Sequence, residues 1–329
     1  MTEHDPSARS PEFKDRRAGL VLFGVLQILI GAFCALMIPL MAASGALSQA
    51  GGVAMDARTM IPAILQYALM AVAGIWLGIG SIRARRWARA LTLVLAWIWL
   101  VCGVLGLLFF ITFMGDMYQQ IAQESRMPSE AIVVMQVVMS GMLGCIYVFL
   151  PGMFILFYQS RHVRATCESR DPQVRWTDRC PLPVLAVSLL LGFGAFSTIG
   201  VLAYGAVVPW FGTLLSGVGG LGVMVANALL LSVFAWGIYK LKKWAWLGTT
   251  ALIAILSVSA IMTFSRVSLL EMYEKMNFPE GQLELMQKYG MFEKMNFPWM
   301  MGICLAAYLA YLLYVGRYFV SSPSPGDAG

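Results

Sequence analysis

Long runs of apolar residues that contain no Asp, Glu, Lys or Arg limit the fold of this chain more than any other feature. A bilayer crossing needs about 20 apolar residues, whereas a buried core helix rarely needs more than about 14. The hydrophobic fraction of 59% and the mean hydropathy of +0.74 are far above those of globular chains. We therefore predict an all-α membrane protein with eight transmembrane helices, at residues 19–44, 61–82, 90–114, 132–159, 182–208, 218–239, 245–265 and 299–316.

The first apolar run follows basic residues and precedes small ones, which is also the pattern of a secretory signal peptide. The run at 18–43 is about twice as long as a signal-peptide core, which spans roughly 7 to 15 residues. We interpret it as an uncleaved first span. A cleaved signal that leaves seven spans is the alternative.

The positions of Lys and Arg predict the orientation, because cytoplasmic loops carry the excess of these residues. If the N-terminus is cytoplasmic, all but six of the 23 basic residues fall on the cytoplasmic side. We expect both termini in the cytoplasm and a location in the cell membrane. The six outer basic residues are Arg58, Arg126, Arg266, Lys275, Lys288 and Lys294.

The sequence repeats internally. Residues 80–88 and 237–245 align without a gap, and a glycine, three basic residues, a tryptophan and an alanine recur in both. Further matches follow at a nearly constant offset, which predicts a duplication into two parallel four-helix repeats. These matches pair Tyr158 with Tyr314, Arg161 with Arg317, and residues 31–33 with 194–196.

The repeat predicts the domain organisation. The segment 161–181 is short and charged, so we expect a solvated cytoplasmic linker between the two units. The predicted parts are a cytoplasmic polar tail at 1–18, a first four-helix membrane unit at 19–160, the linker at 161–181, a second four-helix membrane unit at 182–320 with an outer amphipathic loop at 266–298, and a cytoplasmic tail at 321–329.

Each basic turn has a tryptophan at the start of the next span, where an amphipathic ring suits the headgroup region and cations reach lipid phosphates. We expect these residues to be interfacial anchors, and a specific lipid-binding site is the alternative. The sequence at 85–89 resembles basic turns between spans in uncharacterised bacterial multi-pass membrane proteins; this resemblance implies a bacterial inner membrane and carries no activity. The expected anchors are Arg83, Arg85, Arg86, Trp87, Lys240, Lys242, Lys243 and Trp244.

The longest outer loop contains its own duplication, Glu-Lys-Met-Asn-Phe-Pro at 274–279 and again at 293–298. Between the copies, apolar residues recur at helical spacing among charged ones. We predict a short amphipathic helix at 280–292 that lies on the outer membrane surface and contacts a protein partner or a second copy. Its contact residues are Leu283, Met286, Tyr289 and Phe292.

Groups that could support catalysis are scarce. The chain has two histidines, and the predicted spans contain no ionisable Asp, Glu, Lys, Arg or His. His162, Cys167 and Cys180 lack the paired spacing of a zinc site. The GxGxxG pattern at 217–222 opens a predicted span without the acidic residue that a dinucleotide site requires, so close helix packing explains it better.

The 22 methionines gather toward the outer side and suit packing or partner contacts, with a Cu(I) site as the alternative. We assign no catalytic, cofactor-binding or metal-binding residue and expect no enzyme. The expected function is that of a non-catalytic integral membrane protein that acts through helix or loop contacts, and the alternative is a transporter or channel for a neutral or lipid-like solute. The expected partners are the lipid bilayer and a protein partner or homo-oligomer, with no nucleic acid.

Overall fold

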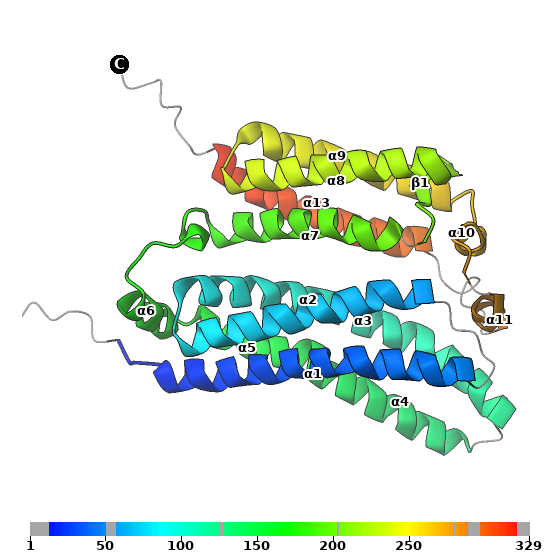
Figure 1. Ribbon diagram of the computed structural model, residues 1–329, viewed down its shortest axis with the longest axis horizontal. Coiled ribbons are helices and arrows are strands. Elements are labelled where there is room, and N and C mark those ends of the chain that lie inside the picture. Colours follow the sequence, from blue (N-terminus) through cyan, green and yellow to red (C-terminus); the bar gives the residue numbers. More distant parts are fainter. Residues whose placement is uncertain are drawn as a thin grey trace, which may run out of the picture.

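The computed structural model describes residues 13–50, 57–125, 128–202, 204–278, 280–288 and 297–320, and they are predominantly helical (Figure 1). Among them, eight helices are long and apolar enough to cross a membrane, as a multi-pass membrane protein requires. The first four spans are α1 (Arg17–Ala50), α2 (Ala57–Ile82), α3 (Arg86–Ser125) and a composite of α4 (Ser129–Gly144), a π-helical turn (Cys145–Phe149) and α5 (Leu150–Gln159). The last four are α7 (Leu182–Leu202), α8 (Gly217–Tyr239), α9 (Lys243–Phe264) and α13 (Phe297–Val320).

Large apolar side chains cover the outside of these helices. Leu22 is 68% exposed, Val72 is 67% exposed and Leu156 is 78% exposed, although each belongs to a regular helix. Such a surface is unfavourable in water and favourable in lipid, where every peptide group must also find its hydrogen bond within its own segment. The helical fold and the apolar exterior therefore have the same cause.

The spans pack as neighbouring pairs, α1 with α2, α3 with α5, α7 with α8, and α9 with α13. Glycines bring α1 and α2 close together. A Cβ atom on Gly78 would lie 2.6 Å from the carbonyl oxygen of Gly24, and one on Gly31 would lie 2.9 Å from that of Ala71. Helices in lipid gain contact area in this way, since small residues let their backbones approach.

Helix α7 connects the two halves of the bundle. It contacts α2 and α3 of the first half as well as α8 and α13 of the second. Leu77 and Leu91 belong to the same buried cluster as Val184 and Leu185 of α7. A second cluster, around Leu20 and Tyr158, lies within the first half.

The elements that connect the spans lie at the two ends of the bundle. Figure 1 shows the start of α1, the short helix α6 (Arg161–Arg170) and the turns from α2 to α3 and from α8 to α9 at one end. The strands β1 (Val208–Trp210) and β2 (Thr213–Leu215) and the short helices α10 (Leu269–Lys275) and α11 (Glu280–Lys288) lie at the other end.

The predicted span at 182–208 is too long. Helix α7 ends at Leu202, and an antiparallel hairpin pairs Val208 with Leu215. Gly205 and Ala206 have positive φ angles of 82° and 53°, so the chain leaves the helical path there. Other helices extend beyond their predicted bounds, most of all α3, which continues to Ser125, and the fourth span contains a π-helical turn.

We predict that Gly78→Ile destabilises the protein, because the added side chain must displace the backbone of α1. The expected loss is about 1 to 3 kcal/mol, typical of overpacking, and a thermal unfolding curve in detergent measures it. Gly106→Ile is the matched control, since a Cβ atom there has no neighbour within 4 Å. Equal melting temperatures for the two variants would contradict the close α1–α2 contact.

Candidate functional site

The candidate site is the end of the bundle that carries both predicted basic turns. It comprises the first basic turn (residues 83–86), the second basic turn (residues 240–243) and the segment at 161–181, and we call it the basic end. The expected anchors lie within the two turns or directly after them.

The two basic turns have the same backbone geometry. Ala84 and Leu241 adopt left-handed conformations with φ of 51° and 55°. The amide of Arg85 donates to the carbonyl of Gly80, and the amide of Lys242 donates to that of Gly237, both at 2.9 Å. These are the hydrogen bonds of a Schellman motif, in which the left-handed position is usually a glycine. A larger residue occupies it in both turns.

The glycine and the tryptophan of each turn also match. A Cβ atom on Gly80 would meet the Trp87 ring and the Ala88 methyl group, and one on Gly237 would meet the Trp244 ring and the Ala245 methyl group. The sequence motif therefore has a packing reason in both places, because only glycine leaves room for the next helix. Trp87 also stacks on Trp76 with ring centroids 4.3 Å apart.

Carboxylates of the segment at 161–181 neutralise the first basic turn. Asp171 accepts two hydrogen bonds from the Arg175 guanidinium, at 3.0 and 2.6 Å. It also pairs with Arg85 at 3.4 Å and accepts the backbone amide of Arg86 at 3.3 Å. The side chain of Arg86 pairs with Asp178 at 3.2 Å. Two of the expected lipid anchors thus have partners within the protein.

Asp171 is the buried centre of this network, with only 2% of its side chain exposed. The hydrogen bonds from Arg175, followed by the amide of Arg86, hold the pKa of Asp171 below its ordinary value against the effect of burial. The carboxylate is therefore ionised at neutral pH. Sequence reasoning missed it, because its only local signal is an acidic residue within a basic segment.

The expectation of a solvated linker at 161–181 is wrong, because this segment folds against the bundle. Val163, Thr166 and Cys167 of α6 recur at helical spacing and are at most 1% exposed. The Thr166 hydroxyl accepts the backbone amide of Arg16 at 3.1 Å. Burial raises the pKa of the Cys167 thiol to about 11. The short segment needs no core of its own, since it completes that of the first half.

Contacts from α6 and α5 connect the remaining parts of the basic end. Arg170 pairs with Asp15 at 3.0 Å, which holds the start of α1. The Tyr158 hydroxyl, which is fully buried, contacts Ser81 at the end of α2. The start of α1, the end of α2 and the end of α5 are distant in sequence, and these contacts bring them together at α6.

The lysines of the second basic turn have no described carboxylate partner, although Tyr239 beside them donates its hydroxyl to the Trp176 carbonyl at 3.0 Å. Lys240, Lys242 and Lys243 are exposed and make no ion pair with any residue that the structure describes. Trp244 beside them is 47% exposed, and Trp236 is 58% exposed. This turn has the free cations and the accessible indole rings that an interfacial anchor needs. Arg83 is also exposed, in the first turn.

The predicted contact helix is found in part. Helix α11 covers Glu280–Lys288 and places Leu283 on a partly buried position. Met286 also belongs to α11, whereas Tyr289 and Phe292 lie outside the described residues. The loop before α11 is held by Phe278, whose ring stacks on Tyr204 at 5.3 Å and meets Tyr273 edge-on at 4.8 Å.

The hairpin beside this loop is the main feature that the sequence did not predict at the end of the bundle opposite the basic end. The amides of Phe211 and Gly212 donate to the hydroxyls of Ser259 and Thr263 on α9, both at 3.0 Å. Trp210 and Phe211 are 37% and 42% exposed and lie edge-to-face. The signals that could have found the hairpin are Gly205, Pro209 and Gly212.

The other candidate motifs have structural roles. The backbone amide of Lys14 donates to Nδ1 of His162 at 3.4 Å, and no cluster of three metal-ligating side chains occurs among the described residues. The GxGxxG pattern follows β2 and opens α8, but Gly220 is needed where α8 packs against the Ala206 carbonyl. The strand belongs to a hairpin, not to the parallel unit of a dinucleotide site.

No protein family, curated protein or solved structure matches the chain.

We predict that Asp171→Asn loosens the segment at 161–181, because four donors lose an ionised acceptor. The expected loss is about 1 to 3 kcal/mol, as for hydrogen bonds to a charged group. Maleimide labelling of Cys167, read by peptide mass spectrometry, should rise from near zero. Glu168→Gln is the control; its carboxylate is 39% exposed, so the expected change is below about 1 kcal/mol. Protection of Cys167 in both variants would contradict the role of Asp171.

The same pair of proteins should show a defined pH dependence. Because the pKa of Asp171 is lowered in the folded state, its contribution to stability is present above about pH 4 and is lost as the pH falls through the lowered value. The difference in melting temperature between the natural protein and Asp171→Asn should be largest near pH 7 and shrink below about pH 4. A difference that grows on acidification would be inconsistent with this assignment.

Proposed function

We propose that this chain is a non-catalytic integral membrane protein of a bacterial inner membrane that acts through contacts of its helices and outer loops. The observation that carries the proposal is the use of polar side chains within the spans. The hydroxyls of Thr249, Ser257 and Thr263 donate to carbonyls of their own helix, and Ser188 of α7 donates to the Ala235 carbonyl of α8. The Ser188 bond joins two helices, and the other three hydroxyls are satisfied within α9, so these groups support packing and are not offered to a solute.

The end of the bundle opposite the basic end, which this proposal places outside the cell membrane, supplies the surface for partner contacts. It combines the exposed rings of Trp210 and Phe211 at the hairpin tip with α10 and α11. Aromatic side chains on an ordered support are common in protein interfaces. The partner is a second protein chain or a second copy of this one, as the sequence pattern of α11 predicts.

The alternative function, transport of a neutral or lipid-like solute, has one specific observation in its favour. The side-chain oxygens of Gln27 and Asn227 are buried within spans and accept no hydrogen bond from the residues that the structure describes. Buried oxygens of this kind would serve as acceptors in a solute site. The amide nitrogen of Gln27 does donate to Thr92 at 2.9 Å, which favours a packing role.

The duplication into parallel four-helix units is part of the proposal. Its support is the shared geometry of the two basic turns and the equal order of helix pairs in the two halves. A further correspondence lies between the first two helices of each half. A Cβ atom on Gly74 would lie 3.0 Å from the Cα atom of Gly31, and a Cβ atom on the aligned Gly194 would lie 3.5 Å from the Leu231 side chain.

We predict that both basic turns and both termini face the cytoplasm, because the positive residues concentrate there. A fusion of alkaline phosphatase after Arg89 should be inactive, and a fusion of green fluorescent protein at the same point should fluoresce. Fusions within the hairpin provide the control with the opposite pattern. Phosphatase activity from the fusion after Arg89 would overturn the orientation.

We predict that Met286→Glu abolishes a crosslinked species, because it places a charge on the apolar side that the sequence of α11 predicts for partner contact. Crosslinking in membranes followed by gel electrophoresis measures it, and the level of inserted protein must stay unchanged. Gln287→Glu is the matched control, since it adds the same charge at the next position, which is exposed. Loss of the species in both variants, or in neither, would argue against a contact surface on α11.

A further inference from the structure

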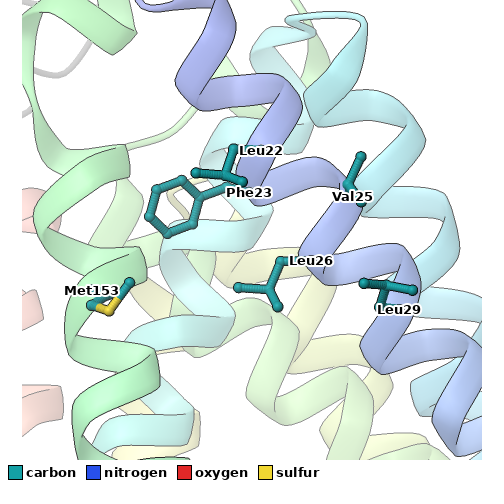
Figure 2. A pocket seen from close by; sticks show the side chains of 6 residues that line it. All are labelled: Leu22, Phe23, Val25, Leu26, Leu29 and Met153. Carbon is teal, nitrogen blue, oxygen red and sulfur yellow. The ribbon is translucent and has the colours of Figure 1, made fainter.

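A groove between α1 and α5 is not used by the function proposed above. It encloses about 230 Å³, and hydrocarbon and thioether side chains form its walls. Figure 2 shows Phe23 and Leu26 of α1 directed toward the gap beside Met153 of α5. The lining residues are Leu22, Phe23, Val25, Leu26, Leu29 and Met153.

A second cavity of about 360 Å³ continues the groove toward the basic end. The two cavities share Phe23 and Met153, so they adjoin. The second one adds the side chains of Arg16 and Ser160, which give it polar groups. The groove therefore has an apolar body and a polar mouth.

Aromatic packing forms the boundary between the body and the mouth. The absence of a side chain on Gly19 lets the Phe157 ring lie against α1, where a Cβ atom would be 2.5 Å from the ring. Phe23 stacks on Phe157 with centroids 4.4 Å apart. This stacking contact joins α1 to α5 near the basic end. Farther from the basic end, the groove separates the two helices.

The mouth has positive potential. Arg16 is exposed, and its guanidinium forms no ion pair in the described part of the chain, because the neighbouring Asp15 pairs with Arg170. Ser160, which lines this mouth, is the N-cap of α6 and makes no side-chain capping bond, so the first amides of α6 have no side-chain cap. Arginine and a helix N-terminus are both favourable for a phosphate group.

The length of the groove corresponds to the thickness of one membrane leaflet. From Arg16, directly before α1, to Leu29 the groove extends for about 20 Å, at about 1.5 Å per residue. Half of a hydrocarbon core is about 15 Å thick. An acyl chain that starts at the mouth would end near the middle of the membrane.

We infer that this groove binds one anionic phospholipid, with its phosphate at Arg16 and Ser160 and one acyl chain between α1 and α5. The charged mouth at headgroup depth distinguishes this occupant from a partner helix, which would be apolar at both depths. The lipid joins the start of α1 to α5 and α6. The inference is independent of the proposed contact function.

Native mass spectrometry of the full-length protein in detergent, with added phosphatidylglycerol or phosphatidylcholine, tests the charged mouth. The natural protein should retain one phosphatidylglycerol in preference to phosphatidylcholine. Arg16→Gln should weaken phosphatidylglycerol binding about tenfold, as expected for one lost charge-assisted contact. Arg17→Gln is the control, because Arg17 is equally exposed and does not line either cavity. Equal losses in both variants would show only general attraction of surface lipid and would overturn the inference.

A second pair of variants tests the apolar body. Leu26→Trp should fill the groove and remove the retained phosphatidylglycerol, whereas Leu36→Trp, at a 62% exposed position of α1 that lines neither cavity, should leave it. Unchanged retention in Leu26→Trp would exclude the groove as the acyl-chain site. If Leu26→Trp does not fold, phosphatidylglycerol binding by Arg16→Gln decides whether the inference holds, since the Arg16 variant alters only an exposed side chain.

Discussion

The interior of a bilayer offers no hydrogen-bond partner to a peptide group, and the rest of this structure depends on that constraint. Within the spans the backbone is helical, and the irregular backbone lies at the ends of the bundle. Where irregular backbone approaches a span, side chains satisfy it, as Ser259 and Thr263 do for the hairpin amides. The same constraint explains why Leu22 and Leu156 face outward, because lipid is their solvent. Packing between helices then relies on close approach, as between Gly24 and Gly78, since no water is expelled when helices meet in lipid.

The two basic turns show how one backbone motif supports two different surfaces. Their hydrogen bonds and left-handed residues are the same, yet Asp171 pairs with the first turn, whereas no described carboxylate pairs with the lysines of the second. The first turn thereby becomes part of a folded cap that holds the start of α1. The second leaves three lysines and Trp244 exposed. Two turns of equal backbone geometry thus differ in their surfaces through a few charged residues.

The spans could be predicted from the sequence because hydropathy over about 20 residues is a local property. The fold of residues 204–216 was missed, because Val207, Val208, Leu214 and Leu215 continue the apolar character of α7 and outweighed the turn signals Gly205 and Gly212. The fold of 161–181 was missed for another reason. Its stability depends on contacts such as Arg86 with Asp171, which lie 85 residues apart, and a single sequence contains no signal for that pairing. The charge of the segment suggested solvation, although its carboxylates meet arginines from another part of the chain.

The basic end and the end with the hairpin lie at opposite ends of the eight spans, and in a multi-pass membrane protein they would lie on opposite sides of the membrane. Single-cysteine labelling with a membrane-impermeant maleimide in sealed vesicles tests this most directly, in a protein that lacks its six natural cysteines. Arg83→Cys and Lys242→Cys should react from the same side of the membrane, and Trp210→Cys should react only from the other. Reaction of residues 83 and 242 from opposite sides, or of residue 210 from the same side as both, would contradict the arrangement of the spans.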